Sequence, residues 1–411
     1  MPVGAGWDNE SGGGLTLVAD TAERADHGAI DGAFHDHYCE GDARLQLGGG
    51  FFRPESRPSR DLGVLLCAVL AQQAAEAGLD FPVLDLMAGC GIRALRYGLE
   101  AGACHVWAND ADGDRLPLLR SNLAPLGGMV TITDHTAQKL LARCLLEERR
   151  FAVVDLDAFG CPSPLVPAAL EALKFDGVLY MASTDGRSPT GHDRPAAIRS
   201  LAASARAHPS SWELALRLQI AVVARAAWAM GRGVRPLFSF SEGRTFRTAI
   251  QLQRRAEPRQ ERWLGLLAHC HSCGEQLHQP LLQLRQWPEC CCGADGPPLA
   301  VSGPLWLGPL QHAPVLRAMK ELAKRWPTGR VIRTSSNLLQ KLIADPGVPA
   351  CCWPTAELAR RLGGGPPSTH ALLAALQAEG YTALRSGVMA GQFRSNAPWS
   401  RVIALASALN R

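Results

Sequence analysis

The stretch FAVVDLDAFGCPSPLVPAALEAL, residues 151–173, contains the two elements that decide the fold. Its first four residues are apolar, as in a strand buried inside a sheet, and the segment after its first proline has the apolar spacing of a helix. Two carboxylates, Asp155 and Asp157, stand at the end of the strand, where burying a charge is costly unless a partner stabilises it. The stretch therefore predicts a strand–helix unit with functional groups at the carboxyl end of the strand.

The same alternation extends in both directions along the chain. Four further apolar runs predict strands, and helix-like stretches separate them, which is typical of a parallel sheet with helices on both faces. These runs are residues 82–89, 105–110, 130–133 and 177–183. A long amphipathic helix (210–231) and a hairpin (236–254) follow, and we expect the hairpin to close the sheet. The predicted fold class is α/β, with a Rossmann-like domain.

Composition divides the chain into three parts. Residues 1–48 are rich in Gly and Asp with weak periodicity, so we expect a partly flexible N-terminal segment. Residues 49–258 hold the predicted sheet domain. Residues 259–411 form a C-terminal α+β domain, in which the segment 264–300 is rich in Cys, His and Pro. Two short helices and an Arg-bearing strand pair near the end predict a small winged-helix-like module.

Overall composition limits the classes of protein. The 411 residues are 47% hydrophobic with a formal net charge of +4, which is typical of a folded globular chain and says little about partners. No apolar run approaches the ~18 residues that span a bilayer, and no secretory signal pattern follows Met1. We therefore expect a cytoplasmic protein without membrane association, whose 13 cysteines are thiols or metal ligands. Nothing in the sequence indicates an obligate protein partner.

A Gly-rich loop predicts a nucleotide site in LDLMAGCGIRALRYG, residues 84–98. Gly89 and Gly91 allow the backbone to approach a ligand closely, and the helix that follows favours negative charge at its start. Asp110 ends the next strand, where an acid can accept hydrogen bonds from ribose hydroxyls. The same spacing fits a dinucleotide fingerprint. An NAD-dependent Rossmann oxidoreductase, an S-adenosyl-L-methionine enzyme and a turn without ligand all remain open at this point.

The sequence Asp157-Ala158-Phe159-Gly160 favours methyl transfer to an exocyclic amine of a nucleobase. Such an amine is a weak nucleophile, and a carboxylate beside a backbone carbonyl can accept its two N–H groups. Asp157 and the Ala158 carbonyl supply these acceptors, and the Phe159 ring can stack on an extruded base. The alternative is that Asp157 caps the next helix and Phe159 lies in the core. Asp155 points to the opposite face of the strand and is expected to be structural.

Seven segments together resemble the tRNA (guanine-N(2)) dimethyltransferase family, in order along the chain. They are FFRPESRPSRDLGV (51–64), DLMAGCGIRALRYGLE (85–100), DLDAFGCPSP (155–164), STDGRSPTG (183–191), PLFSFS (236–241), GPLWLGPL (303–310) and NAPW (396–399). The resemblance implies a class I methyltransferase domain that uses S-adenosyl-L-methionine, a C-terminal domain that binds tRNA, and dimethylation of guanine 26. A non-catalytic RNA-binding protein with a degenerate methyltransferase domain is the non-enzymatic alternative.

The resemblance also implies individual roles. Asp157 matches the catalytic aspartate and Phe159 the neighbour that stacks on the base. Residues that match cofactor contacts are Arg60, Asp85, Gly89, Arg93, Asp110, Thr136 and Ala137. Ala158 stands where the family has proline, which leaves the carbonyl in place. Basic residues expected to contact tRNA phosphates are Arg330, Arg333, Arg360, Arg361, Arg385 and Arg394. Glu213 is expected either to face the target base or to lie on a solvated helix face.

A cysteine cluster predicts a structural zinc site. Cys270-x-x-Cys273 is a tight turn with two thiols, and Cys290 and Cys292 offer a second pair with one residue between them. This second pair is irregular, so a histidine can replace one ligand. The candidate histidines are His269, His271 and His278. Cys351 and Cys352 have no partner pair and are expected in the core.

Overall fold

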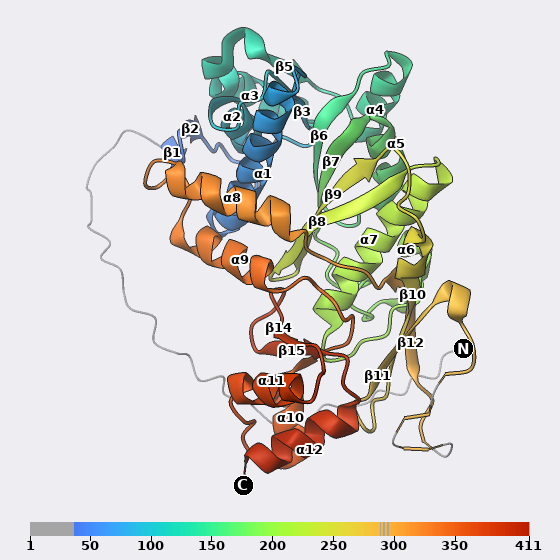
Figure 1. Cartoon of the computed structure of the whole chain (residues 1–411). Coiled ribbons are helices and arrows are strands. Elements are labelled where there is room, and N and C mark those ends of the chain that lie inside the picture. Colours follow the sequence, from blue (N-terminus) through green and yellow to red (C-terminus); the bar gives the residue numbers. More distant parts are fainter. Residues whose placement is uncertain (1–36, 288, 291, 294–295, 411) are drawn as a thin grey trace, which may run out of the picture. The chain divides into compact units, whose positions relative to one another are not determined.

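A seven-stranded sheet is the centre of the computed structural model, which describes residues 37–287, 289–290, 292–293 and 296–410 (Figure 1). The strand order is β5-β4-β3-β6-β7-β9-β8. The strands are β3 (Pro82–Asp85), β4 (His105–Asn109), β5 (Val130–Thr133), β6 (Phe151–Ala158), β7 (Leu173–Ser183), β8 (Gly233–Glu242) and β9 (Thr245–Gln253). Strands β3 to β7 are parallel, and the β8–β9 hairpin joins β7 in antiparallel orientation. The predicted α/β sheet and its closing hairpin are confirmed.

Helices cover both faces of this sheet. The helices within the sheet domain are α1 (Arg57–Glu76), α2 (Ile92–Leu99), α3 (Leu116–Leu123), α4 (Ala137–Leu146), α5 (Val166–Glu171), α6 (Arg194–Leu201) and α7 (Ser211–Ala229). Successive strand residues point to opposite faces. Val153 therefore packs in the core with α1, α2 and α3, whereas Val154 packs in the core with α4, α5 and α7.

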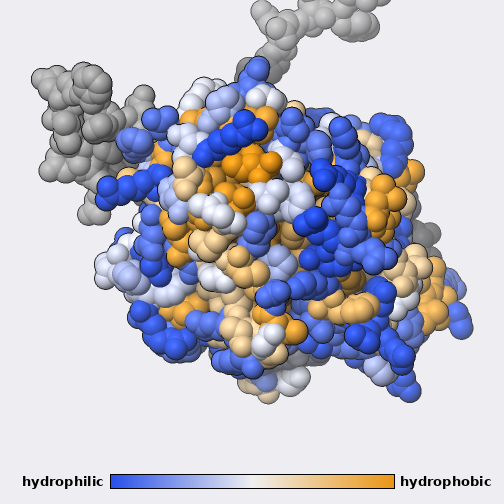
Figure 2. Space-filling view, turned by 90° about the horizontal axis from the view of Figure 1, so that it is seen from above, coloured by the Kyte–Doolittle hydropathy of each residue, from blue (hydrophilic) through white to orange (hydrophobic). Residues whose placement is uncertain are grey.

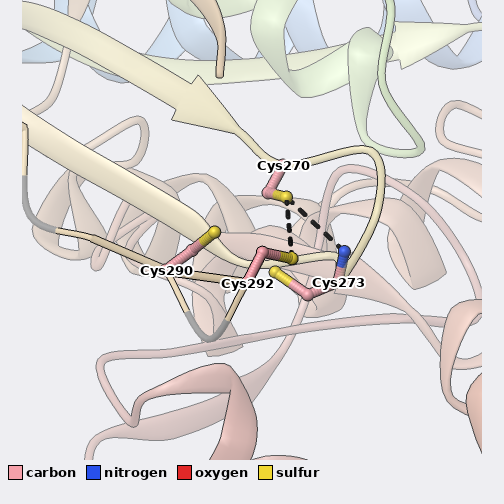
Figure 3. Close-up of side chains that lie close together, drawn as sticks. All are labelled: Cys270, Cys273, Cys290 and Cys292. Atoms are coloured by element: carbon pink, nitrogen blue, oxygen red, sulfur yellow. Dashed lines mark hydrogen bonds between the residues drawn. The ribbon is translucent and has the colours of Figure 1, made fainter. Parts of the chain in front are cut away.

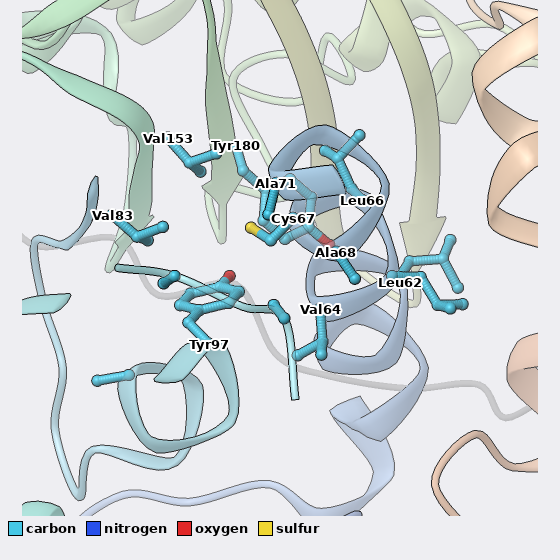
Figure 4. Packing of buried hydrophobic residues seen from close by; sticks show 14 of the residues in the cluster. Leu62, Val64, Leu66, Cys67, Ala68, Ala71, Val83, Tyr97, Val153 and Tyr180 are labelled. Atoms are coloured by element: carbon cyan, nitrogen blue, oxygen red, sulfur yellow. The ribbon is translucent and has the colours of Figure 1, made fainter. Parts of the chain in front are cut away.

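Helix α1 is buried on nearly all sides. Every residue from Ser59 to Val69 is buried. Cys67 points toward Tyr97 and Tyr180, whereas Leu62 and Leu66 project from the other side of the helix (Figure 4). A helix whose residues are buried all round needs partners on every face. The second partner of α1 is the pair α8 (Ala313–Arg325) and α9 (Arg333–Ala344), which lies beside it (Figure 1).

The helices α8 and α9 share the hydrophobic core of the sheet domain. Their buried side chains belong to the same cluster as α1, and these side chains are Leu316, Met319, Leu322, Leu339 and Leu342. The predicted boundary near residue 258 thus separates two parts of the chain that pack into one core. Residues 1–36 of the predicted flexible segment lie outside the described residues. Its end forms a hairpin of β1 (His37–Glu40) and β2 (Ala43–Gln46), with Ala43 and Leu45 buried.

Two small sheets and three helices complete the chain. One sheet has the order β11-β10-β12, and the other has the order β13-β15-β14. The elements are β10 (Leu264–His269), β11 (Gln276–Pro280), β12 (Ala300–Trp306), β13 (Cys352–Pro354), α10 (Thr355–Leu362), α11 (Thr369–Ala378), β14 (Ala383–Arg385), β15 (Gln392–Ser395) and α12 (Trp399–Leu409). The two short helices and the strand pair predicted for a winged-helix-like module are α10, α11, β14 and β15. Cys351 and Cys352 are buried, as expected.

A buried ion network joins α7 to this C-terminal module. Arg394 is fully buried and donates to Glu213 Oε2 at 2.9 Å and to Asp345 Oδ1 at 2.6 Å. Arg217 donates from Nε to Glu213 Oε1 at 2.9 Å. Burial acts to raise the pKa of Glu213, but Arg394 and Arg217 lower it to about 2. Both expectations for Glu213 are therefore wrong, and Arg394 is not available to a tRNA phosphate.

The surface carries scattered hydrophobic side chains. On the face seen in Figure 2, hydrophobic residues lie in small groups between hydrophilic ones, which is usual for a folded chain. Within the described residues, no helix has the length and apolar character needed to cross a membrane. Two exposed aromatic rings, Phe51 and Phe159, line the same cavity.

We predict that Arg394→Met destabilises the protein by about 3–5 kcal/mol, because it leaves Glu213 and Asp345 buried without their shared cation. The measurement is urea unfolding of the full chain. Arg385→Met is the matched control, since Arg385 lies exposed on the neighbouring strand β14, and it should change stability by less than about 0.5 kcal/mol. Equal stabilities of the two variants would contradict the structural role of Arg394.

Candidate active site and metal site

A cavity of about 350 Å³ lies at the carboxyl ends of β3, β4 and β6. Its volume is within the range of small-molecule sites, roughly 300–1,000 Å³. Its walls come from the segment that leads into α1, from the Gly-rich loop after β3, from the ends of β4 and β6, and from the start of β9. In open α/β sheets, ligands bind at this edge, because the loops that follow parallel strands meet there.

The Gly-rich loop has the backbone conformation that requires glycine. Gly89 and Gly91 have φ values of +57° and +85°, and a Cβ on Gly91 would lie 2.7 Å from the Leu119 side chain. The Gly89 N–H donates to Asp110 Oδ2 at 2.7 Å, and Asp112 N–H donates to Oδ1 at 3.0 Å. These bonds fix the Asp110 carboxylate at the cavity wall, where the sequence predicted a ribose contact.

Arg60 lines the cavity and is held by a buried acid. Its Nε and Nη2 donate to the Glu40 carboxylate at 2.8 and 2.7 Å, and its Nη1 donates to the Arg53 carbonyl at 3.1 Å. Glu40 comes from the β1–β2 hairpin and also accepts from Arg96 Nη1 at 2.7 Å. The hairpin therefore fixes the arginine predicted to contact the cofactor.

Arg93 lies against two carboxylates at the end of β6. Its Nη1 is 3.4 Å from Asp155 Oδ2, and its Nη2 is 3.2 Å from Asp157 Oδ2. Asp155 also accepts the Tyr97 hydroxyl at 2.5 Å, and burial raises the pKa of its carboxyl. Asp155 is thus a buried structural acid, as expected. The expectation that it points to the opposite face of the strand from Asp157 is wrong, because residues two apart on a strand share a face and both carboxylates contact Arg93.

Asp157 faces the cavity as an oriented carboxylate. Its side chain keeps 29% exposure, and its Oδ2 lies 3.3 Å from Arg247 Nη2 as well as near Arg93. Although burial acts to raise the pKa of Asp157, the Arg247 and Arg93 guanidinium groups lower it below its ordinary value. Asp157 is part of β6 and pairs with arginines, so the alternative that it caps the next helix is wrong.

Phe159 and Phe51 form an exposed pair at the cavity. Their side chains are 75% and 58% exposed, and their ring centroids are 5.4 Å apart in an edge-to-face arrangement. The alternative that Phe159 is a core residue is therefore wrong. Neither Phe51 nor Arg247 was among the predicted site residues. Phe51 lies in a segment that carried the family resemblance, but no pattern distinguished it from its neighbour Phe52.

Three predicted cofactor residues do not line the cavity. Asp85 is buried and accepts from the Ala94 N–H at 3.1 Å, across the start of α2. Burial raises its pKa well above the ordinary value, and the nearby Asp155 adds to this effect. The Thr136 hydroxyl accepts from the Lys139 N–H at 3.3 Å and caps α4, in whose first turn Ala137 is buried. Their cofactor contacts stay predictions from the resemblance.

The four predicted cysteines gather in one group (Figure 3). The Sγ atoms of Cys270, Cys273, Cys290 and Cys292 all lie within 4.8 Å of one another, and the Cys270 and Cys292 atoms are 3.8 Å apart. Sulfur ligands at about 2.3 Å from a tetrahedral zinc ion lie roughly 3.8 Å from one another. The donor set and its spacing therefore fit structural zinc.

The histidines considered as ligands lie outside this group. His278 Nδ1 is instead 3.4 Å from the buried Cys351 Sγ. The cysteine turn is anchored to the C-terminal module by two tryptophans, because Trp399 Nε1 donates to the Cys273 carbonyl at 2.8 Å and Trp353 Nε1 donates to the Gly274 carbonyl at 2.9 Å. A metal bound by the four cysteines would fix this turn, which carries the two carbonyls that the tryptophans bind.

The sheet order, the Gly-rich loop and the carboxylate at the end of β6 are those of a class I methyltransferase that uses S-adenosyl-L-methionine. The family to which the chain belongs lies within this class of enzymes. The chain belongs to the N2,N2-dimethylguanosine tRNA methyltransferase family, whose model matches residues 46–407. Family membership favours S-adenosyl-L-methionine over a nicotinamide dinucleotide at the Gly-rich loop, and an enzyme over a degenerate domain.

Individual relatives cover most of the chain. It is 33% identical over 370 residues to a tRNA (guanine(26)-N(2))-dimethyltransferase of Methanosphaerula palustris, covering 87% of this chain and 91% of that one. It is 27% identical over 368 residues to the same-named protein of Pyrococcus furiosus, covering 85% and 90%. The structure of Trm1 from Pyrococcus horikoshii with S-adenosyl-L-methionine matches with a TM-score of 0.77 at 24% identity, covering 90% and 99%. This last likeness shows that the fold is shared.

We predict that the purified chain carries about one zinc ion and that Cys270→Ser releases it, because the other three thiolates then bind zinc too weakly. The measurements are elemental analysis and thermal unfolding of the full chain. Cys104→Ser is the control, since Cys104 is exposed and lies outside the cluster. Wild-type protein without zinc, or a Cys270→Ser variant that retains it, would refute the metal site.

Proposed function

We propose that this chain transfers methyl groups from S-adenosyl-L-methionine to the exocyclic N2 amine of guanine 26 in tRNA. The observation that carries this proposal is the Asp157 carboxylate beside the exposed Phe159 ring in the cavity at the Gly-rich loop. Membership of the family and the names of the relatives support the same substrate and position.

The cofactor side of the cavity is formed by charged groups that suit the donor. Arg60 offers a cation to a carboxylate, and Asp110 offers acceptors to ribose hydroxyls. Gly89 leaves space at the loop, because a Cβ at this position would have an Arg115 nitrogen, 3.9 Å away, as its nearest neighbour. When bound, S-adenosyl-L-methionine supplies a methyl group on a positively charged sulfur. Arg93 lies in the cavity wall and contributes by holding Asp157.

The base side of the cavity fits an extruded guanine. An enzyme that reacts with a base edge has to take the base out of its stack. Phe159 and Phe51 offer exposed rings on which a base stacks, an interaction worth about 1–3 kcal/mol per base. Asp157 then accepts a hydrogen bond from the N2 amine and directs its lone pair toward the methyl group.

The tRNA body needs contacts beyond this cavity, since one base cannot select a tRNA. We assign them to the C-terminal part, residues 259–411, which contains the cysteine cluster. Arg333 and Arg385 are exposed there and suit phosphate. Arg360 is also exposed, but it pairs with Glu357 at 2.7 Å. Arg330 is partly exposed and paired with Asp42, so it is a weaker candidate. A tRNA substrate is consistent with the cytoplasmic location that the sequence predicts, and we keep that location as part of the proposal.

We predict that Asp157→Asn lowers methyl transfer by about 10²-fold or more, because the amide keeps the shape but loses the charge that polarises the amine. Binding of S-adenosyl-L-methionine and of tRNA should persist. The measurement is mass spectrometry of nucleosides from treated tRNA, which separates mono- from dimethylguanosine. Asp176→Asn is the control, since Asp176 is exposed and does not line the cavity. Near-normal turnover of Asp157→Asn would overturn the role of Asp157.

A further inference from the structure

Two buried arginines converge on one oxygen of Asp157. Arg93 comes from α2 and Arg247 from β9, and their Nη2 atoms lie 3.2 and 3.3 Å from Asp157 Oδ2. Both side chains are almost inaccessible to solvent, and both line the cavity. Two cations on Oδ2 leave the other carboxylate oxygen, Oδ1, for a donor that enters the cavity.

Arg247 is fixed from a second side by Glu242. The Arg247 Nε lies 3.3 Å from Glu242 Oε2, and Glu242 Oε1 accepts the Ser59 N–H at 3.0 Å. This arrangement links the β8–β9 hairpin to the first turn of α1, one residue before Arg60. Glu242 binds Nε of Arg247, and Asp157 lies at its Nη2. The Arg247 guanidinium therefore has a defined position before any substrate binds, and so does the Asp157 carboxylate.

We propose that Arg247 is a positioning residue of the methyl-transfer reaction, which together with Arg93 holds Asp157 as a carboxylate with Oδ1 directed at the amine of the target base. This inference rests on the proposed function and assigns separate roles to the two oxygens of the Asp157 carboxylate. Arg93 and Arg247 bind one oxygen, and the substrate amine binds the other.

The proton balance of the reaction gives this arrangement its purpose. The N2 amine forms one N–C bond and loses one proton for each methyl group, while the S–CH3 bond breaks and its electron pair stays on sulfur. A carboxylate with two cations on it is a weak base, so Asp157 accepts a hydrogen bond without keeping the proton. The proton passes to a water molecule in the cavity. Water can reach this place because the Asp157 side chain is partly exposed.

The surrounding charges suit a nitrogen that becomes positive. The charged and titratable groups around Asp157 are Arg93 from α2, Arg247 from β9, Asp155 from its own strand, Glu242 from β8, Asp85 from β3 and Tyr180 from β7. This cluster thus contains two cations, and it contains four acids when Asp157 itself is counted. Loss of Arg247 would remove half of the positive charge that keeps Asp157 ionised.

The sign of the pH effect follows from this loss. In the wild type, Arg247 and Arg93 hold the pKa of Asp157 below its ordinary value, so the carboxylate persists as pH falls. Without Arg247, burial and the neighbouring acids raise the pKa, and the active carboxylate is lost at a higher pH. An arginine beside an aspartate shifts its pKa by about 1–3 units. The acid limb of kcat/KM should therefore move upward by about one pH unit or more.

The test uses Arg247→Gln and Arg247→Lys in the full chain, with tRNA as substrate. For Arg247→Gln we expect kcat to fall about 10- to 100-fold, with KM for tRNA within about 3-fold and the acid limb moved upward. Arg247→Lys keeps the charge but loses the fork that reaches both Asp157 and Glu242. We expect its kcat to fall while its acid limb stays near that of the wild type. A merely structural role of Arg247 would not separate these two effects.

The matched control is Arg235→Gln on the adjacent strand β8. The Arg235 side chain is 40% exposed and pairs with Glu257 at 2.7 Å, away from the cavity. The kinetics and pH profile of this variant should therefore be those of the wild type. A double variant provides a second check. In the Asp157→Asn background, Arg247→Gln should cost less than about 3-fold, because the carboxylate that Arg247 positions is already absent.

Glu242→Gln keeps the test decisive if Arg247→Gln does not fold. It retains Arg247 but weakens the contact behind it, and we expect a smaller fall in kcat with unchanged binding of S-adenosyl-L-methionine. Arg247→Gln or Glu242→Gln with wild-type kcat and acid limb, or a fully additive double variant, would overturn the positioning role alone. Wild-type protein that does not methylate guanine 26 would instead overturn the proposed function.

Discussion

Each buried arginine in this chain needs a carboxylate, and this requirement links segments that are far apart in the sequence. Removing one partner of a buried ion pair costs about 3–5 kcal/mol, so every such contact restricts the fold to one arrangement. Arg96 binds Glu40 of the first hairpin and Asp61 of α1, both at 2.7 Å. Arg394 binds Glu213 of α7 and Asp345 beyond α9. The cofactor loop, the sheet and the C-terminal module are thereby fixed to one another.

The sequence predicted the sheet well because its signals are local. Apolar runs of strand length recur between helix-like stretches, and Gly89 and Gly91 mark the turn after β3, where φ is positive. The packing of α8 and α9 on α1 was not predicted. Leu316 and Met319 belong to the apolar face of an amphipathic helix. Periodicity predicts that such a face is buried, but it does not predict which element covers it. Only the unbroken apolar run in the middle of α1, residues 62–71, indicated that this helix needs partners on more than one side.

The same distinction explains the results for the site. Asp157 lies at the carboxyl end of β6, and Phe159 and Asp110 directly follow strands, so the edge of the sheet on which they lie was predictable. Arg247 was missed because it approaches Asp157 across 90 positions of sequence through the antiparallel strand β9. Arg394 was assigned to tRNA because a buried and an exposed arginine read alike in sequence. A buried arginine differs from an exposed one by the carboxylates that pair with it. For Arg394 these are Glu213 and Asp345, which are distant in sequence and lie next to it only in the folded chain.

The joint between α7 and the C-terminal module bears directly on how position 26 can be chosen. The Ser210 hydroxyl before α7 donates to the Cys352 carbonyl at 2.5 Å, and Glu213 one turn later binds Arg394 on β15. Directional polar contacts of this kind have one good geometry, unlike an apolar interface that can slide. If the module grips the tRNA body as we propose, a joint that cannot slide sets a fixed distance from the gripped phosphates to Asp157. Position 26 would then be selected by its distance from the phosphates that the module binds. One stacked base in the cavity makes too few contacts to identify a nucleotide by the bases next to it.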